Sequence, residues 1–118
     1  MVLDAPNALA LAGFYERLLG WPIAEQDAEE AAIAVPGTSS YLAFQTEPDY
    51  VAPVWPAAGD RQQMMMHLDI AVDNLDTAVA DAVQLGATVA EFQPQEDVRV
   101  LLDPAGHPFC LYLDPDLG

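Results

Sequence analysis

The sequence of 118 residues contains no lysine and three arginines, against 19 acidic residues, and its formal net charge is -16. Proteins that bind nucleic acids or anionic membrane surfaces use lysine and arginine to contact phosphate groups. This composition therefore argues against both kinds of partner. The acidity itself has two interpretations, an adaptation to solubility or high salt and a preference for cationic ligands, and composition alone does not separate them.

Cysteine and long apolar runs are also scarce. Cys110 is the only cysteine, so an internal disulfide is excluded and the hydrophobic core must hold the fold together. The sequence has no run of about 18 apolar residues, and residues 1–7 lack the pattern of a secretion signal. These absences predict a cytoplasmic protein. Hydrophobic residues make up 53% of the chain, so we expect one folded domain over residues 1–118 rather than a disordered acidic chain.

Two segments of the chain carry the same order of helix and strand signals. Apolar residues at helical spacing follow Asn7 and again Asn74. Asn7 is the natural N-cap of the first helix, and Asn74 or Asp73 is that of the second. Gly20 and Gly86 stand where the helices should end. We expect strands at residues 2–5, 31–35 and 41–45 in the first half, and at 67–72, 88–92, 98–102 and 109–113 in the second.

This repetition predicts an internal duplication. Superimposing Asn7 on Asn74 places Leu3 opposite Ile70 and matches the two helix ends to within about one residue. We interpret the chain as an α+β protein of two βαβββ modules, module one at about residues 1–46 and module two at about 64–114. Because each module is too small to close a core alone, the two must pair, within one chain or between two chains.

The segment between the modules, residues 47–63, is rich in proline and carries Tyr50 and Trp55. Connections of this length that hold aromatic side chains are typical of lids and binding loops. The other interpretation is a tether whose aromatic side chains pack on the core.

Four stretches of the sequence resemble the glyoxalase / bleomycin-resistance / dioxygenase group, the vicinal oxygen chelate superfamily, and within it the glyoxalase-like subgroup. They are LDAPNALALAGFYERLLGW, YLAFQ, HLDIAVDNLDTAVADAVQLGA and VLLDPAGHPFCL. The resemblance covers almost the whole chain. It implies that the two modules form a half-barrel with a cleft on its concave face, and that the protein is a homodimer.

Metalloenzymes that this sequence resembles take His, Glu or Gln ligands from the first and last strand of each module. The resemblance places His67 at one such position and Cys110 where the group usually has glutamate. The matching position of module one falls at Met1 or just before it, and Gln45 stands for the remaining ligand. Since a divalent ion needs three or four good ligands, we expect no metal cofactor, with a divalent metal held through His67 as the alternative.

Strand alternation sorts the side chains of module two by face. Leu68, Ile70 and Val72 form the apolar set expected under the helix. His67 and Asp69 therefore fall on the opposite face, which the resemblance assigns to the cleft. The candidate ligand-binding residues of the cleft face and the connecting segment are Asp4, Gln45, Tyr50, Trp55, His67, Asp69, Cys110 and Tyr112.

A pocket with this anionic and aromatic character suits a cationic or aromatic small molecule. Asp4 and Asp69 have no lysine to pair with, although bonds to backbone amides or to an arginine are the alternative for both. We interpret the protein as a metal-independent small-molecule binding protein of the glyoxalase/bleomycin-resistance type. The alternatives are a metal-dependent lyase, isomerase or dioxygenase that uses His67, Gln45 and Cys110, and a structural or interaction protein whose own side chains fill the cleft.

Two further features have structural interpretations. The methionines Met64, Met65 and Met66 are expected to fill the core between the modules, with the lining of a pocket as the alternative. His107 lies in the turn DPAGHP, where we expect a hydrogen bond that fixes the turn.

Overall fold

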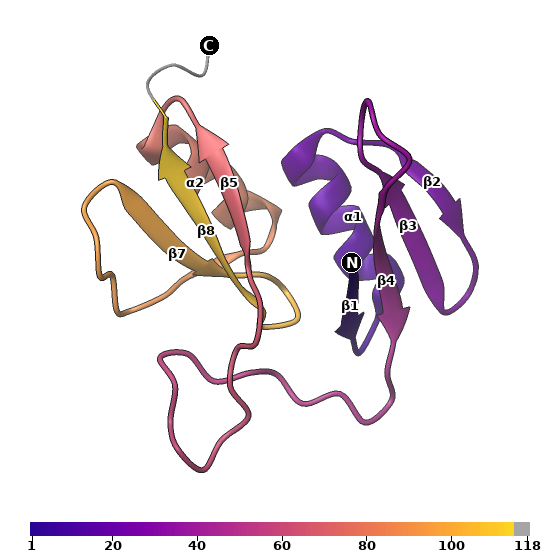
Figure 1. Cartoon of the computed structure of the whole chain (residues 1–118), viewed down its shortest axis with the longest axis horizontal. Coiled ribbons are helices and arrows are strands. Elements are labelled where there is room, and N and C mark those ends of the chain that lie inside the picture. The colour runs from indigo at the N-terminus through magenta and orange to yellow at the C-terminus, as the bar shows by residue number, and fades with distance from the viewer. Residues whose placement is uncertain (115–118) are drawn as a thin grey trace. The chain divides into compact units, whose positions relative to one another are not determined.

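In the computed structural model, which describes residues 1–114, the chain divides into two units, Met1–Tyr50 and Val51–Gly118 (Figure 1). Each unit has the order strand, helix and three strands, which confirms the predicted duplication and the α+β class. The first unit contains β1 (Val2–Ala5), α1 (Ala8–Leu19), β2 (Ile23–Gln26), β3 (Glu30–Ala34) and β4 (Tyr41–Thr46). The second contains β5 (Leu68–Val72), α2 (Leu75–Leu85), β6 (Thr88–Val89), β7 (Val98–Leu102) and β8 (Pro108–Leu113).

The two sheets repeat one topology. Their strand orders are β1-β4-β3-β2 and β5-β8-β7-β6, and in each sheet the first strand pairs in parallel with the last. Leu3 lies beside Phe44 in the first sheet, and Ile70 lies beside Leu111 in the second. The step along the chain between these two pairs equals the step from Asn7 to Asn74. The duplication therefore preserves the register of the parallel strands as well as the order of the elements.

Both helices begin and end as the sequence predicts. The Oδ1 atoms of Asn7 and Asn74 each accept a hydrogen bond from the backbone N–H three residues later, at 3.1 and 3.0 Å. Gly20 and Gly86 end the helices with φ angles of 72° and 119°, in the left-handed region that favours glycine. Each helix thus satisfies its terminal backbone groups through residues that the sequence identifies.

The first unit has an aromatic core. The ring of Tyr15 stacks on Phe44 with centroids 5.7 Å apart and meets Phe14 edge to face at 4.9 Å. All three side chains are almost completely buried. In the second unit the largest buried side chains are Phe109, with Leu101 and Leu111, and α2 contributes Ala82 as its one fully buried residue.

Two strands differ from the sequence prediction. The sequence does not predict the strand β2, because three of its four residues are exposed and no apolar alternation marks it. The strand β6 stops at Val89 instead of continuing to residue 92. Beyond it, the Ala90 N–H still donates to the Val100 carbonyl at 3.0 Å. The Gln93 side chain then takes the place of the strand, because it donates to the carbonyls of Ala90 and Val100 and accepts from the Val100 N–H, each at 2.9 Å.

The turn 103–107 is built around the Asp103 carboxylate, which is 4% exposed. Its Oδ1 atom accepts hydrogen bonds from the backbone N–H groups of Ala105 and His107, at 2.9 and 3.0 Å. The Nδ1 atom of His107 lies 2.8 Å from Oδ2. The expected turn-fixing hydrogen bond of His107 is thus confirmed.

The segment 51–63 belongs to the second unit and packs against it. Trp55 lies against Phe92 with ring centroids 5.8 Å apart. Gly106 faces Ala52 so closely that a Cβ atom built on the glycine would lie 2.9 Å from the Ala52 Cβ. These two contacts hold the segment that carries Trp55 at a defined place on the unit. Among the described residues, no helix is long and apolar enough to cross a membrane.

Candidate functional site

The sheet of the second unit carries a hollow of about 570 Å³, a size typical of small-molecule sites. Side chains from β5, β7 and β8 line it, together with the segments that precede β5 and β7. Five of the sequence-predicted binding residues lie in this lining: Trp55, His67, Asp69, Cys110 and Tyr112.

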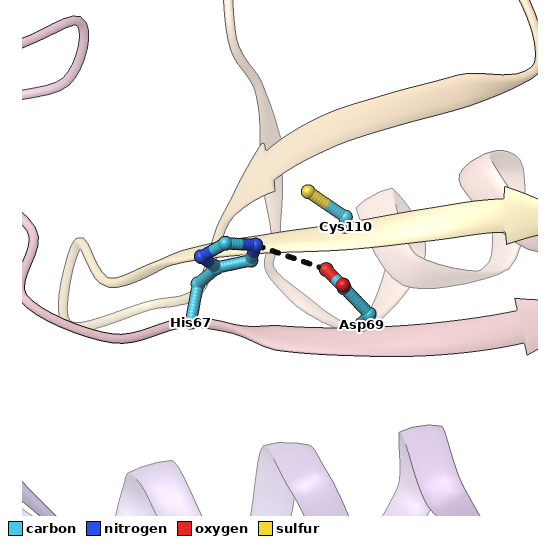
Figure 2. A group of neighbouring side chains, drawn as sticks. All are labelled: His67, Asp69 and Cys110. Atoms are coloured by element: carbon cyan, nitrogen blue, oxygen red, sulfur yellow. Dashed lines mark ion pairs between the residues drawn. The ribbon is translucent and has the colours of Figure 1, made fainter.

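Three of these side chains meet at one point of the hollow. Asp69 on β5 is the register neighbour of Cys110 on β8, so the two side chains leave adjacent strands on the same face. His67 stands two residues before Asp69, and strand alternation therefore directs it to that face as well. Figure 2 shows the imidazole turned toward the carboxylate, with Nε2 3.0 Å from Oδ1, and the thiol beside them.

The group offers one nitrogen, one oxygen and one sulfur atom, all within 4.8 Å of one another. The side chains of His67 and Asp69 are 37% and 58% exposed, and Cys110 is half-buried. Partial burial raises the pKa of the Cys110 thiol from 9.0 to about 11, and the charge of Asp69 and its hydrogen bond with the thiol add to this effect. At neutral pH Cys110 is therefore a thiol rather than a nucleophilic thiolate.

The lining also contains residues that the sequence did not identify. Asp97, directly before β7, is a second acidic residue in the lining in addition to Asp69, and Gln95 adds an amide side chain. The Nη1 atom of Arg99 lies 2.8 to 3.0 Å from three carbonyl oxygens of the loop 95–98, so this guanidinium fixes the loop. The only sequence signal for Asp97 is its place directly before the predicted strand at 98–102.

The three consecutive methionines separate. Met64 lines the hollow, whereas Met65 and Met66 are 89% and 68% exposed. The alternative expectation, the lining of a pocket, therefore holds for Met64. A core between the modules that contains the methionines stays a prediction.

The other predicted residues lie in the first unit. Asp4 and Gln45 are register neighbours on β1 and β4, and Gln45 lines a separate hollow of about 460 Å³ on that sheet. Tyr50 is the last residue of the unit. A single site that combines these three residues with those of the second unit stays a prediction.

Several solved structures have the same fold as this chain. A glyoxalase/bleomycin resistance protein/dioxygenase family enzyme from Burkholderia phytofirmans PsJN is 17% identical, with a TM-score of 0.73 and coverage of 96% of this chain and 94% of that one. A glyoxalase-related enzyme from Fulvimarina pelagi is 18% identical, with a TM-score of 0.69 and coverage of 98% and 86%. A glyoxalase/bleomycin resistance protein from Albidiferax ferrireducens T118 is 18% identical, with a TM-score of 0.65 and coverage of 97% of this chain and 95% of that one.

No curated protein matches the sequence. The model of the glyoxalase-like domain family, in contrast, matches residues 1–112, which is nearly the whole length of the chain. The protein therefore belongs to the glyoxalase-like domain family, as the four sequence stretches predict.

Proposed function

We propose that the protein binds a small organic molecule carrying a positive charge and an aromatic ring in the hollow of the second unit, without a metal cofactor. One observation carries this proposal. The described residues that line the hollow include the carboxylates of Asp69 and Asp97 and neither lysine nor arginine. Asp69 has the His67 imidazole 3.0 Å away, and no lysine or arginine of the described residues lines the hollow beside either carboxylate, which favours a ligand that brings the positive charge itself.

The aromatic lining supports the same class of ligand. Trp55 and Tyr112 both line the hollow, and the contact of Trp55 with Phe92 fixes the place of its indole ring. A cation over the face of such a ring gains about 0.5–1 kcal/mol at an exposed site and about 2 kcal/mol when water is excluded. Stacking of a flat ligand on the indole adds to this attraction.

Two further expectations belong to this proposal. The resemblance to the glyoxalase/bleomycin-resistance group supports a homodimer, and a cytoplasmic location is the second expectation. Light scattering of the purified chain tests the first expectation, with a mass of twice 12.7 kDa as the expected result.

A matched set of ligands tests the binding proposal. We expect basic aromatic drugs to raise the melting temperature of the protein and anionic thioesters to leave it unchanged, since a ligand stabilises only the state that it binds. Isothermal titration of the best cation should show at least about a tenfold weaker affinity for Asp97→Asn, from the loss of about 1.4 kcal/mol of attraction.

The control variant is Asp81→Asn, which removes an equal charge from an exposed position of α2. It should bind the cation as the parent protein does. If both variants weaken cation binding equally, the effect comes from the net charge of the protein and not from the hollow, which contradicts the proposal. Stabilisation by neutral or anionic compounds alone would overturn it as well.

The alternative function is a metal-dependent lyase, isomerase or dioxygenase. It is favoured by the three donor atoms of His67, Asp69 and Cys110, which lie within 4.8 Å of one another and would hold the ion. When bound there, a divalent ion supplies a Lewis acid that polarises a substrate oxygen. Turnover that is lost on chelation and regained with added metal would select this alternative over simple binding.

A further inference from the structure

We propose that Gly106 and Ala52 are positioning residues for Trp55, and that their contact fixes where the indole ring lies in the hollow of the second unit. The contact thereby determines how well the hollow accepts a flat aromatic ligand. This effect on the ligand rests on the proposed function, whereas the placement of the ring does not.

The close approach of the two residues leaves no room for a side chain at position 106. A Cβ atom built on Gly106 would lie 2.9 Å from the Ala52 Cβ, whereas ordinary contacts between carbon atoms are about 3.5–4.0 Å long. No other described glycine has a neighbour closer than 3.5 Å to such an atom. A side chain at position 106 therefore requires a displacement of roughly 0.6 Å or more between the two residues.

The turn that carries Gly106 is held by hydrogen bonds of both the side chain and the backbone of Asp103. The carboxylate, 4% exposed, accepts from the N–H groups of Ala105 and His107 at 2.9 and 3.0 Å. The Gly106 N–H donates to the Asp103 carbonyl at 2.8 Å, and the Asp103 N–H donates to the His107 carbonyl at 2.9 Å. Ala52, in contrast, is exposed. We therefore expect a clash to displace the segment 51–63 and not the turn.

A displacement of Ala52 reaches the indole ring through a stiff stretch of chain. Pro53 follows Ala52, and its pyrrolidine ring fixes the backbone φ angle. The Val54 N–H donates to the Gln62 carbonyl at 2.7 Å, and the Gln62 side chain donates to the carbonyl of Val51 at 3.0 Å. Since these bonds tie both ends of the stretch 51–54 to one residue, the stretch moves as a body and takes the next residue, the tryptophan, with it.

The indole ring connects this segment to the hollow. Trp55 lies against Phe92 with ring centroids 5.8 Å apart, and it is part of the lining. Stacking and cation–π attraction both require the ring at a short distance from the ligand. A displaced ring should therefore weaken the binding of a flat aromatic cation more than that of an aliphatic cation of equal charge, which depends on Asp69 and Asp97.

The fluorescence of Trp55 tests the placement of the ring. The chain has two tryptophans, so every protein in this experiment carries Trp21→Phe, which leaves Trp55 as the one indole. Gly106→Ala and Ala52→Ile should each move the emission to longer wavelength and increase its quenching by acrylamide. The double variant Gly106→Ala/Ala52→Gly should recover the parent emission, because it lacks the Cβ atom at position 52. A loss of stability alone would not be repaired in this way.

The control variant is Gly37→Ala. The φ angle of Gly37 is 76°, in the same left-handed region as the 92° of Gly106, but nothing lies within 4 Å of a Cβ atom built on Gly37. The control thus introduces backbone strain without the contact, and it should leave the Trp55 emission unchanged. If Gly106→Ala fails to fold, Ala52→Ile at its exposed position still tests the contact. Parent-like emission of the folded contact variants, or no recovery in the double variant, would overturn the proposal.

Isothermal titration tests the effect on the ligand. N-methylacridinium serves as the flat aromatic cation, and tetraethylammonium as the aliphatic cation of equal charge. Gly106→Ala should lower the affinity for N-methylacridinium about three- to tenfold, and that for tetraethylammonium by less than about twofold. A shifted Trp55 emission with an unchanged ratio of the two affinities would overturn the role in ligand selection. If the parent protein binds neither ion, the proposed function fails, whereas the Trp55 emission still decides whether the contact places the ring.

Discussion

In the second sheet Asp69 lies beside Cys110, whereas the equivalent register position of the first sheet pairs Val2 with Ala43. Two sheets of the same topology thus carry side chains of different chemical type at equivalent positions of the paired strands. The packing of the helices also differs between the two units. Helix α1 contributes five buried residues, two of them aromatic, while α2 contributes one alanine.

This comparison shows how a duplicated module divides its roles. The first unit buries large side chains, such as Phe14 and Phe44, in its core. The second keeps polar side chains on its sheet around an open hollow. Since the strand register is equal in the two units, a few substitutions on one face are enough to give the hollows of the two sheets different linings.

The largest expected effect concerns the aromatic core of the first unit. Phe44→Ala should lower the free energy of unfolding by about 3–5 kcal/mol, because it removes a buried ring and its stacking on Tyr15. Tyr112→Ala on the equivalent strand β8 removes a ring that is 37% exposed and should cost clearly less. Urea unfolding measures both, and equal losses would contradict the contrast between the two units.

The next effect concerns the thiol of Cys110. With its pKa raised from 9.0 to about 11, Cys110 should react with iodoacetamide at pH 8 about 100-fold more slowly than an ordinary thiol, since reactivity follows the thiolate fraction. Asp69→Asn should speed the reaction. In a Cys110→Ser background, the thiol introduced by Ala43→Cys should react faster than Cys110, because Val2 rather than a carboxylate is its neighbour on the paired strand.

The raised pKa of Cys110 also makes the stability of the folded protein depend on pH in the alkaline range. Between pH 9 and about 11 the folded protein retains the Cys110 proton while the unfolded chain loses it. The contribution of this group to stability is therefore present below pH 9 and falls as the pH rises through that window. Cys110→Ser should flatten this part of the stability profile, and an unchanged slope would contradict the assignment of the shift to Cys110.

The smallest effect tests what the two units share. Asn7→Ala and Asn74→Ala should each lower the free energy of unfolding by about 0.5–2 kcal/mol, because each removes the same capping hydrogen bond. The corresponding Asn→Gly variants should cost only a few tenths of a kcal/mol. A measurable loss in one unit and none in the other would show that the helix starts are not equivalent.

The sequence predicts the helices well because their ends depend on local chemistry. Asn7 and Asn74 cap them and Gly20 and Gly86 end them, and each of these residues acts within about one helical turn. The strand β2 escapes prediction because its exposed residues give no alternating pattern. Pairing with β3 defines it, and that pairing is a property of the fold rather than of the segment.

The site is predicted in part for the same reason. Alternation along β5 places His67 and Asp69 on one face, and the parallel pairing with β8 adds Cys110. Asp97 and Met64 enter the lining through segments that precede strands, where no periodicity indicates which way a side chain points. The hollow therefore contains a carboxylate that only the three-dimensional structure identifies.

The Gln93 side chain has a consequence for the behaviour of the chain in concentrated solution. Because β6 pairs only with Leu101 and Leu102, the adjoining edge of β7 would otherwise present a free backbone N–H at Val100, whose carbonyl already accepts from the Ala90 N–H at 3.0 Å. The Gln93 side chain accepts from this N–H and donates to the same carbonyl, at 2.9 Å each. A single amide thus closes a sheet edge that could recruit a strand from another molecule, and the second unit gains protection against edge-to-edge aggregation.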